Sequence, residues 1–203
     1  RHGTPLKRGD FQGHVSAKRL DQINGSLRER PFQGLIVACP YTPDLMVQKT
    51  LDNAGPFSSF LLDKLLPKIR RQHAIADGSG AIGIDGVSLG GRIALMVGLA
   101  SPEAFGSLST LQAALRGYEA DELVRRSSTA IKKNPALRLR LLTSEADFYK
   151  AEIEDLHKRL LSAKVPHDHA VVIGPHGYSF NRGPGAIEML LWHDRILRGE
   201  EPV

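Results

Sequence analysis

A serine flanked by glycines stands at residue 88, in the segment GVSLG (residues 86–90), which fits the pattern G-x-S-x-G. An apolar run at residues 81–87 leads into this segment, and a run of small and apolar residues at 90–100 follows it. The order predicts a strand, a sharp turn and a helix, with Ser88 in the turn. Free N–H groups and the helix dipole at a helix start favour developing negative charge. The pattern therefore predicts a nucleophilic serine.

A serine hydroxyl is a poor nucleophile until a base removes its proton, so a histidine is required. His176 fits this role because it lies in the loop GPHGY (residues 174–178), directly after the apolar residues 170–173. In strand-and-helix folds of this kind, the histidine follows the last strand. The other candidates lie on charged helical faces or inside a late helix: His73, His157 and His193.

An acid that orients the histidine is expected just after the β-type run at residues 137–143. Two carboxylates compete there, Asp147 and Glu145. Asp147 is favoured because its side chain is short and an aromatic pair follows it. Glu145 is the alternative, since it is closer to the strand end. Either carboxylate could instead cap the helix that follows.

Composition excludes several other classes of protein. Apolar residues make up 41% of the 203 residues and charged residues 24%, with a net charge of +5. The basic group at residues 68–71 ends an apolar helical run, so a nucleic-acid partner is not expected. No apolar stretch approaches the roughly 18 residues that a membrane span needs. The sequence predicts neither a compartment nor an oligomeric state.

No metal and no cofactor is expected. His167 and His169 form an H-x-H pair, but no cluster of Cys, Asp or Glu completes a ligand set around it. The single cysteine, Cys39, excludes an internal disulfide. It lies in an apolar run at residues 35–39 and is expected to be a buried core residue.

Short β-type runs alternate with longer helical runs, which predicts one α/β domain over residues 1–203, a three-layer α/β/α sandwich with a mostly parallel sheet. Arg138 and Arg140 alternate with leucines, so we expect either that one face of their strand reaches solvent or that the strand lies near an edge of the sheet. The β-type runs are residues 35–39, 81–87, 137–143 and 170–173, and the helical runs are 57–71, 90–100, 120–126, 149–163 and 186–198.

Four segments together resemble the esterase family that includes enterochelin esterase, esterase D and the mycolyltransferases: residues 60–67 (FLLDKLLP), 86–91 (GVSLGG), 101–106 (SPEAFG) and 174–176 (GPH). The resemblance implies an α/β-hydrolase fold and an esterase acting on a small-molecule ester. Ser88, His176 and Asp147 would cleave the ester through an acyl-enzyme intermediate. The alternatives are an acyltransferase or thioesterase with the same residues, or a non-catalytic member that binds a ligand or partner.

The first residues, His2-Gly3-Thr4, are similar to the H-G-x that follows the family's third strand. The resemblance implies an oxyanion hole formed by the N–H groups of Thr4 and Leu89. It also implies that the first strands of the fold precede residue 1. We therefore expect an upstream segment or a second chain to supply a strand between residues 35–39 and 81–87. If those two runs pair directly, a donor near Tyr41 would replace Thr4.

Overall fold

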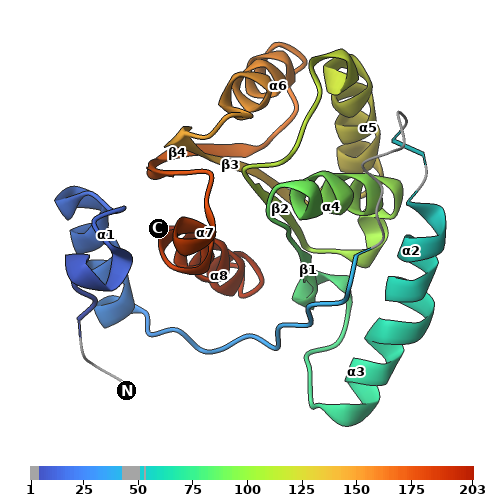
Figure 1. Cartoon of the computed structure of the whole chain (residues 1–203). Helices are drawn as coiled ribbons and strands as arrows, with labels where there is room; N and C mark the ends of the chain where they lie inside the picture. The colour runs from blue at the N-terminus through green and yellow to red at the C-terminus, as the bar shows by residue number, and fades with distance from the viewer. Residues whose placement is uncertain (1–4, 43–50, 53) are drawn as a thin grey trace.

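A parallel sheet forms the centre of the computed structural model, which describes residues 5–42, 51–52 and 54–203 (Figure 1). Within these residues the sheet has four strands, in the order β1-β2-β3-β4, and each is parallel to its neighbours. The strands are β1 (Gly83–Ile84), β2 (Ser107–Leu111), β3 (Arg138–Ala146) and β4 (Asp168–Pro175). The predicted α/β architecture with a parallel sheet is confirmed.

Helices cover both faces of this sheet. Figure 1 shows α4, α5 and α6 on one side, α7 and α8 on the other, and α1 beyond α8. None of the described helices is long and apolar enough to cross a bilayer. The helices are α1 (Ala17–Glu29), α2 (Gly55–Ser59), α3 (Leu66–Gln72), α4 (Leu89–Ala100), α5 (Ala120–Lys133), α6 (Lys150–Ser162), α7 (Tyr178–Arg182) and α8 (Pro184–Ile196); a π-helical segment, Phe60–Leu65, joins α2 to α3, and short 3-10 turns lie at Arg8–Phe11, Ser79–Ala81, Pro102–Ala104 and Gly117–Glu119.

Alternate residues of the strands serve the two faces, because successive side chains of a strand point in opposite directions. Leu139 and Leu141 of β3 belong to the main core under α4, α5 and α6. Leu142, the next residue of β3, instead packs with Phe180 of α7 in a smaller cluster on the other face. The central strands β2 and β3 are therefore buried on both sides, whereas Val171 and Ile173 of β4 are partly exposed.

The α8 face of the sheet is partly polar, and this corrects the expectation for Arg140. Its side chain is buried, so this face of β3 does not reach solvent at Arg140, although β3 does lie next to β4, the last strand of the described sheet. The guanidinium donates to Ser109 Oγ (3.1 Å) and to the Glu188 carbonyl (3.1 Å), and it stacks over the Trp192 ring at 4.7 Å. Burial lowers the pKa of Arg140 to about 10. The Arg140 side chain can be buried because α8 supplies the Glu188 carbonyl and the Trp192 ring as partners.

Two further expectations are wrong. Residues 35–39 form no strand, and Ile36 and Val37 are 50% and 61% exposed. Cys39 is exposed instead of lying in the core. The strand that pairs with β1 is β2, which the apolar pattern did not predict. Residues 35–39 do not pair with β1, so the expectation of a further strand between them stays a prediction.

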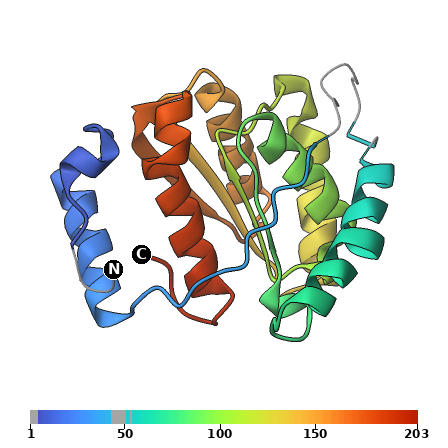
Figure 2. The same ribbon diagram turned by 60° about the horizontal axis from the view of Figure 1, so that its bottom comes forward.

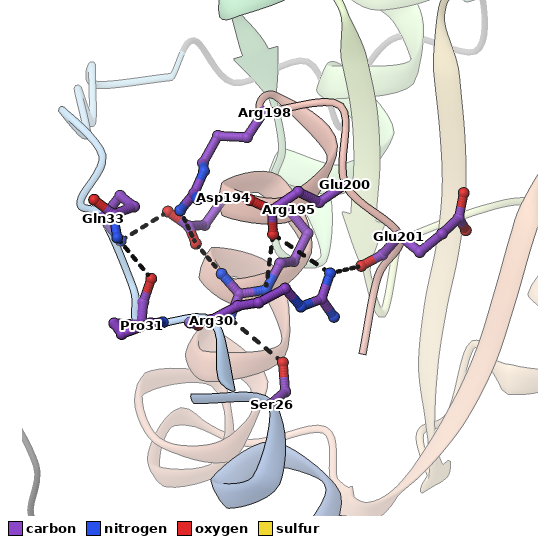
Figure 3. Close-up of polar contacts among 9 residues, drawn as sticks. All are labelled: Ser26, Arg30, Pro31, Gln33, Asp194, Arg195, Arg198, Glu200 and Glu201. Atoms are coloured by element: carbon purple, nitrogen blue, oxygen red, sulfur yellow. Dashed lines mark hydrogen bonds and ion pairs between the residues drawn. The ribbon is translucent and has the colours of Figure 1, made fainter. Parts of the chain in front are cut away.

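A cluster of polar contacts, which we call the polar joint, attaches the end of α1 to the end of α8 (Figure 3). The buried Arg195 side chain donates to Asp194 Oδ2 (2.5 Å) and to the Arg30 carbonyl. The Gln33 N–H donates to Asp194 Oδ1 (3.2 Å), and Arg30 donates to the Glu201 carbonyl (3.0 Å). From this joint, residues 31–42 run as an extended chain past α8 toward the α2 side (Figure 2).

Candidate active site

Ser88 lies in a sharp turn between β1 and α4, as the sequence predicts. Its φ of +55° is unusual for a residue other than glycine, and such strain is typical of functional turns. The Ser88 N–H donates to the Leu111 carbonyl of β2 (2.9 Å), and the Leu111 N–H donates to the Gly86 carbonyl (2.9 Å). A Cβ at Gly86 would lie 2.2 Å from the Gly90 backbone, so only glycine fits there. The close-packed backbone holds the serine at the start of α4.

His176 and Asp147 meet Ser88 at the carboxyl ends of the strands. Ser88 Oγ lies 3.0 Å from His176 Nε2, and His176 Nδ1 lies 2.7 Å from Asp147 Oδ1. Because a carboxylate only accepts, the proton of a neutral imidazole belongs on Nδ1, which leaves Nε2 free to accept from the serine hydroxyl. We call Ser88, His176 and Asp147 the open triad. The structure brings these three sequence-predicted residues together.

Neighbouring groups fix the orientation of the Asp147 carboxylate, whose side chain is fully buried. Thr143 Oγ1 donates to Asp147 Oδ2 (2.6 Å), and the Tyr149 N–H donates to Asp147 Oδ1 (3.0 Å). Sequence reasoning missed Thr143, although a hydroxyl near a strand end, four residues before the candidate acid, is the available signal. With both its oxygens occupied, the carboxylate has one position in which to face His176.

An aromatic pair packs around the imidazole. The Phe148 ring stacks on the His176 ring with centroids 4.1 Å apart, and the Tyr149 ring meets it edge-on at 5.7 Å. Phe148 is nonetheless 67% exposed, so its other face is open to solvent. The stacked face limits how far the imidazole can tilt away from Ser88.

The remaining candidates lie elsewhere. Glu145 is exposed and lines a cavity of about 280 Å³ between α1, β4 and α8, and no hydrogen bond joins it to His176. Leu89 is the first residue of α4, where a backbone N–H has no partner within the helix. Thr4 lies outside the described residues. In the part of the chain that the structure describes, no three metal-binding side chains are placed to hold a metal ion.

A second Ser-His-Asp group, which the sequence did not predict, lies between the sheet and α8. His193 Nδ1 is 2.8 Å from Ser107 Oγ, and His193 Nε2 is 3.0 Å from Asp85 Oδ2. Asp85 Oδ1 also accepts the Gly86 N–H (2.7 Å). We call Ser107, His193 and Asp85 the buried triad. The ring faces its carboxylate through Nε2, the reverse of the arrangement at His176.

The buried triad has no room for a substrate. Ser107 is fully buried at the start of β2, away from the carboxyl ends where ligands bind in parallel sheets. A Cβ placed on Gly83 would lie 2.5 Å from His193 Nδ1 and 2.7 Å from Ser107 Oγ, so the backbone of β1 already fills the space beside this pair. The open triad is therefore the candidate active site.

The fold is that of α/β-hydrolase-type enzymes, as the solved structures that it resembles show. A ferulic acid esterase aligns with a TM-score of 0.60 at 16% identity, covering 70% of this chain and 61% of its own. The enterobactin esterase of Shigella flexneri aligns with a TM-score of 0.58 at 22% identity, covering 73% of this chain and 39% of its own. A fluorophosphonate-binding serine hydrolase of Staphylococcus aureus aligns with a TM-score of 0.58 at 14% identity, covering 67% of this chain and 62% of its own. This chain thus spans less than two thirds of each.

The family is shown by the sequence itself. A family profile described as "Putative esterase" matches residues 48–160, more than half of the chain. The chain belongs to this esterase family, and the resemblance inferred from the four sequence segments is confirmed. No curated protein sequence matches the chain.

Proposed function

We propose that the protein is a serine hydrolase that cleaves a carboxylic ester through an acyl-enzyme intermediate. One observation carries the proposal. The hydrogen bonds from Ser88 to His176 and from His176 to Asp147 have the lengths that nucleophilic catalysis requires, and they end on a strained serine at a helix start. Membership of the esterase family supports the same chemistry.

In the first half-reaction, Ser88 Oγ attacks the ester carbonyl carbon while His176 Nε2 takes the hydroxyl proton. Asp147 stabilises the imidazolium that forms, and the stacked Phe148 ring adds a cation–π contribution. As the tetrahedral intermediate collapses, Nε2 returns the proton to the departing alcohol oxygen. The products are a free alcohol and an acyl group bound to Ser88.

The tetrahedral intermediate carries its negative charge on the former carbonyl oxygen, which needs hydrogen-bond donors. The Leu89 N–H supplies one, because it is the first N–H of α4 and lies next to the nucleophile. By family resemblance the Thr4 N–H supplies the other. A single donor of this kind is worth about 2.7–4 kcal/mol of activation free energy.

In the second half-reaction, His176 removes a proton from water, and the hydroxide oxygen attacks the acyl carbon. Ser88 leaves and regains its proton from Nε2, which restores the starting state. The same groups would serve an acyltransferase if another alcohol replaced water, and a thioesterase if a thiolate left first. Water is the acceptor in our proposal because the profile match is to esterases.

A fluorophosphonate probe tests the proposal, since it forms a covalent bond only with an activated serine. We expect one label per chain, located on Ser88 by mass spectrometry, and none on Ser88→Ala. Purified protein should also release p-nitrophenol from p-nitrophenyl acetate. An unlabelled, inactive but folded protein would favour the non-catalytic binding alternative. Acyl transfer to an added alcohol in preference to water would favour the acyltransferase.

A further inference from the structure

The end of β2 touches all three segments that carry the open triad. Leu111, its last residue, accepts the Ser88 N–H and donates its own N–H to the Gly86 carbonyl, which holds the turn that leads to the serine. The next residue, Gln112, donates its backbone N–H to the Leu142 carbonyl of β3 (2.8 Å). The end of β2 is therefore hydrogen-bonded both to the turn around Ser88 and to β3, the strand that precedes Asp147.

The side chain of Gln112 extends this connection to the histidine. Its Nε2 donates to Ser144 Oγ on β3 (2.5 Å) and to the Pro175 carbonyl (3.0 Å). Pro175 directly precedes His176, and the Ser144 carbonyl accepts the N–H of Asp147 (3.2 Å). One amide group thus contacts the neighbours of both His176 and Asp147.

Both the backbone conformation and the side-chain environment of Gln112 are energetically unfavourable. Its φ is +53°, a region that suits glycine or asparagine better than glutamine. The side chain is fully buried, and Oε1 finds no hydrogen-bond partner among the described residues. Strain and an unpaired buried polar atom persist together only where the surroundings enforce them, which is typical of functional sites.

We propose that Gln112 is a positioning residue that sets the distance between His176 and Ser88, an inference that rests on the proposed function. The length of its side chain is essential, because Nε2 must cross from β2 past β3 to the end of β4. Strands lie about 4.8 Å apart, so asparagine, one methylene shorter, does not reach Pro175. Without the hydrogen bond from Nε2, the loop that carries His176 is no longer connected to β2, the strand that holds the Ser88 turn.

The experiment compares Gln112→Asn and Gln112→Met with the parent. Asparagine tolerates the backbone conformation and keeps the amide but is too short, whereas methionine keeps the length but has no donor. We expect kcat for p-nitrophenyl acetate to fall about 10- to 100-fold in both variants, with KM within about threefold. Rates are expressed per active site, counted by fluorophosphonate labelling. The Nδ1 proton of His176 should shift in its downfield NMR resonance.

Ser107→Ala is the matched control, because it also removes one buried hydrogen bond at β2, but at the opposite end of the strand. Its kcat should stay within about twofold of the parent and its His176 resonance should not move. A loss of kcat in the control equal to that of Gln112→Asn would reduce Gln112 to a structural role and overturn the proposal.

The outcome is decisive even if Gln112→Met fails to fold, because Gln112→Asn is compatible with the backbone. A kcat within about threefold of the parent and an unchanged His176 resonance in Gln112→Asn would overturn the positioning role. Failure of the proposed function looks different, since the parent itself would then lack the fluorophosphonate label. In that case the His176 resonance still reports whether Gln112 sets the position of the ring.

Discussion

Two hydrogen-bonded groups of serine, histidine and aspartate lie within the described residues, and the contrast between them shows that hydrogen bonds alone do not define an active site. In the open triad the serine has a strained backbone and starts a helix. In the buried triad the serine is in a regular strand, and solvent does not reach it. The distances from serine to histidine differ little, 3.0 Å against 2.8 Å.

The two serines differ in the space beside them and in the backbone N–H donors nearby. Ser88 has the first N–H groups of α4 beside it, where an oxyanion would be stabilised. Ser107 has the backbone of β1 and the His193 ring beside it, at distances that leave no space for a carbonyl group. The buried triad instead ties α8 to β2 and, through Asp85, to the Gly86 N–H at the start of the serine turn. We therefore expect the buried triad to serve stability, whereas the open triad is the one that we propose for chemistry.

The largest expected difference is in activity when each serine is removed. Ser88→Ala should lower the rate of p-nitrophenyl acetate hydrolysis by at least about a thousandfold, because the nucleophile is lost. Ser107→Ala should retain the rate to within about twofold. Steady-state kinetics on purified, folded variants measures both. If Ser88→Ala retained activity within about tenfold of the parent, the assignment of the nucleophile would be wrong.

The second difference concerns the two acids that compete in the sequence. Asp147→Asn should reduce kcat by about a thousand- to ten-thousandfold, because an amide favours the wrong tautomer of His176. Glu145→Gln, the matched control two residues away, should change kcat by less than about twofold, since no hydrogen bond joins Glu145 to His176. Equal losses in the two variants would contradict the assignment of Asp147.

The third difference concerns stability, where Ser107→Ala, and not Ser88→Ala, is expected to have the larger effect. Ser107→Ala should lower the free energy of unfolding by about 1–3 kcal/mol, because His193 Nδ1 loses its buried partner. Ser88→Ala should change it by less than about 0.5 kcal/mol, because Ser88 is only half-buried. Urea denaturation followed by circular dichroism measures both values. A more destabilising Ser88→Ala would remove the division of roles between the two triads.

The smallest expected effect comes from a histidine without a carboxylate partner. His169 stacks on His157 with ring centroids 4.0 Å apart, and burial, followed by the charge of His157, lowers the pKa of His169 to about 4. In the unfolded chain its pKa is about 6.5, so between these values the unfolded state binds the extra proton. Stability should therefore fall as the pH drops from about 6.5 to 4.

Partial exposure of His169 limits this loss to about 1 kcal/mol. His169→Phe keeps the ring and removes the titration, so its free energy of unfolding should vary less with pH over the same interval. Denaturation curves at several pH values compare the parent with this variant. Identical pH profiles would show that His169 titrates normally in the folded protein.

Local patterns singled out the three residues that the structure brings together as the open triad. The glycines around Ser88 and the loop around His176 are short-range signals, because turn geometry depends on the residues within the turn. The choice of Asp147 over Glu145 came from side-chain length and position after a strand, and both depend on neighbouring residues. The sequence analysis missed Thr143, although its bond to Asp147 spans only four residues, and it missed Gln112 because its side-chain contacts lie on other strands.

The misassigned regions depend on distant partners. β2 was missed because Ser107 and Ser109 interrupt its apolar pattern, and they are polar because His193 and Arg140 reach them from other elements. Residues 35–39 have a strand-like composition, yet composition does not show whether a pairing strand lies beside them. The same limit applies to the burial of Arg140, whose partner Trp192 is far along the chain.

The attachment of α1 has a consequence for the order in which the structure opens. Arg19 binds Glu188, 169 residues away, and Gln33 binds Asp194, 161 residues away, so these contacts close very long loops. A 13-residue helix such as α1 is marginal when isolated in water. It should therefore dock late in folding and detach early, in a partial opening that leaves the sheet intact. In a native-state hydrogen-exchange experiment, the amides of α1 would exchange well before those of β2 and β3.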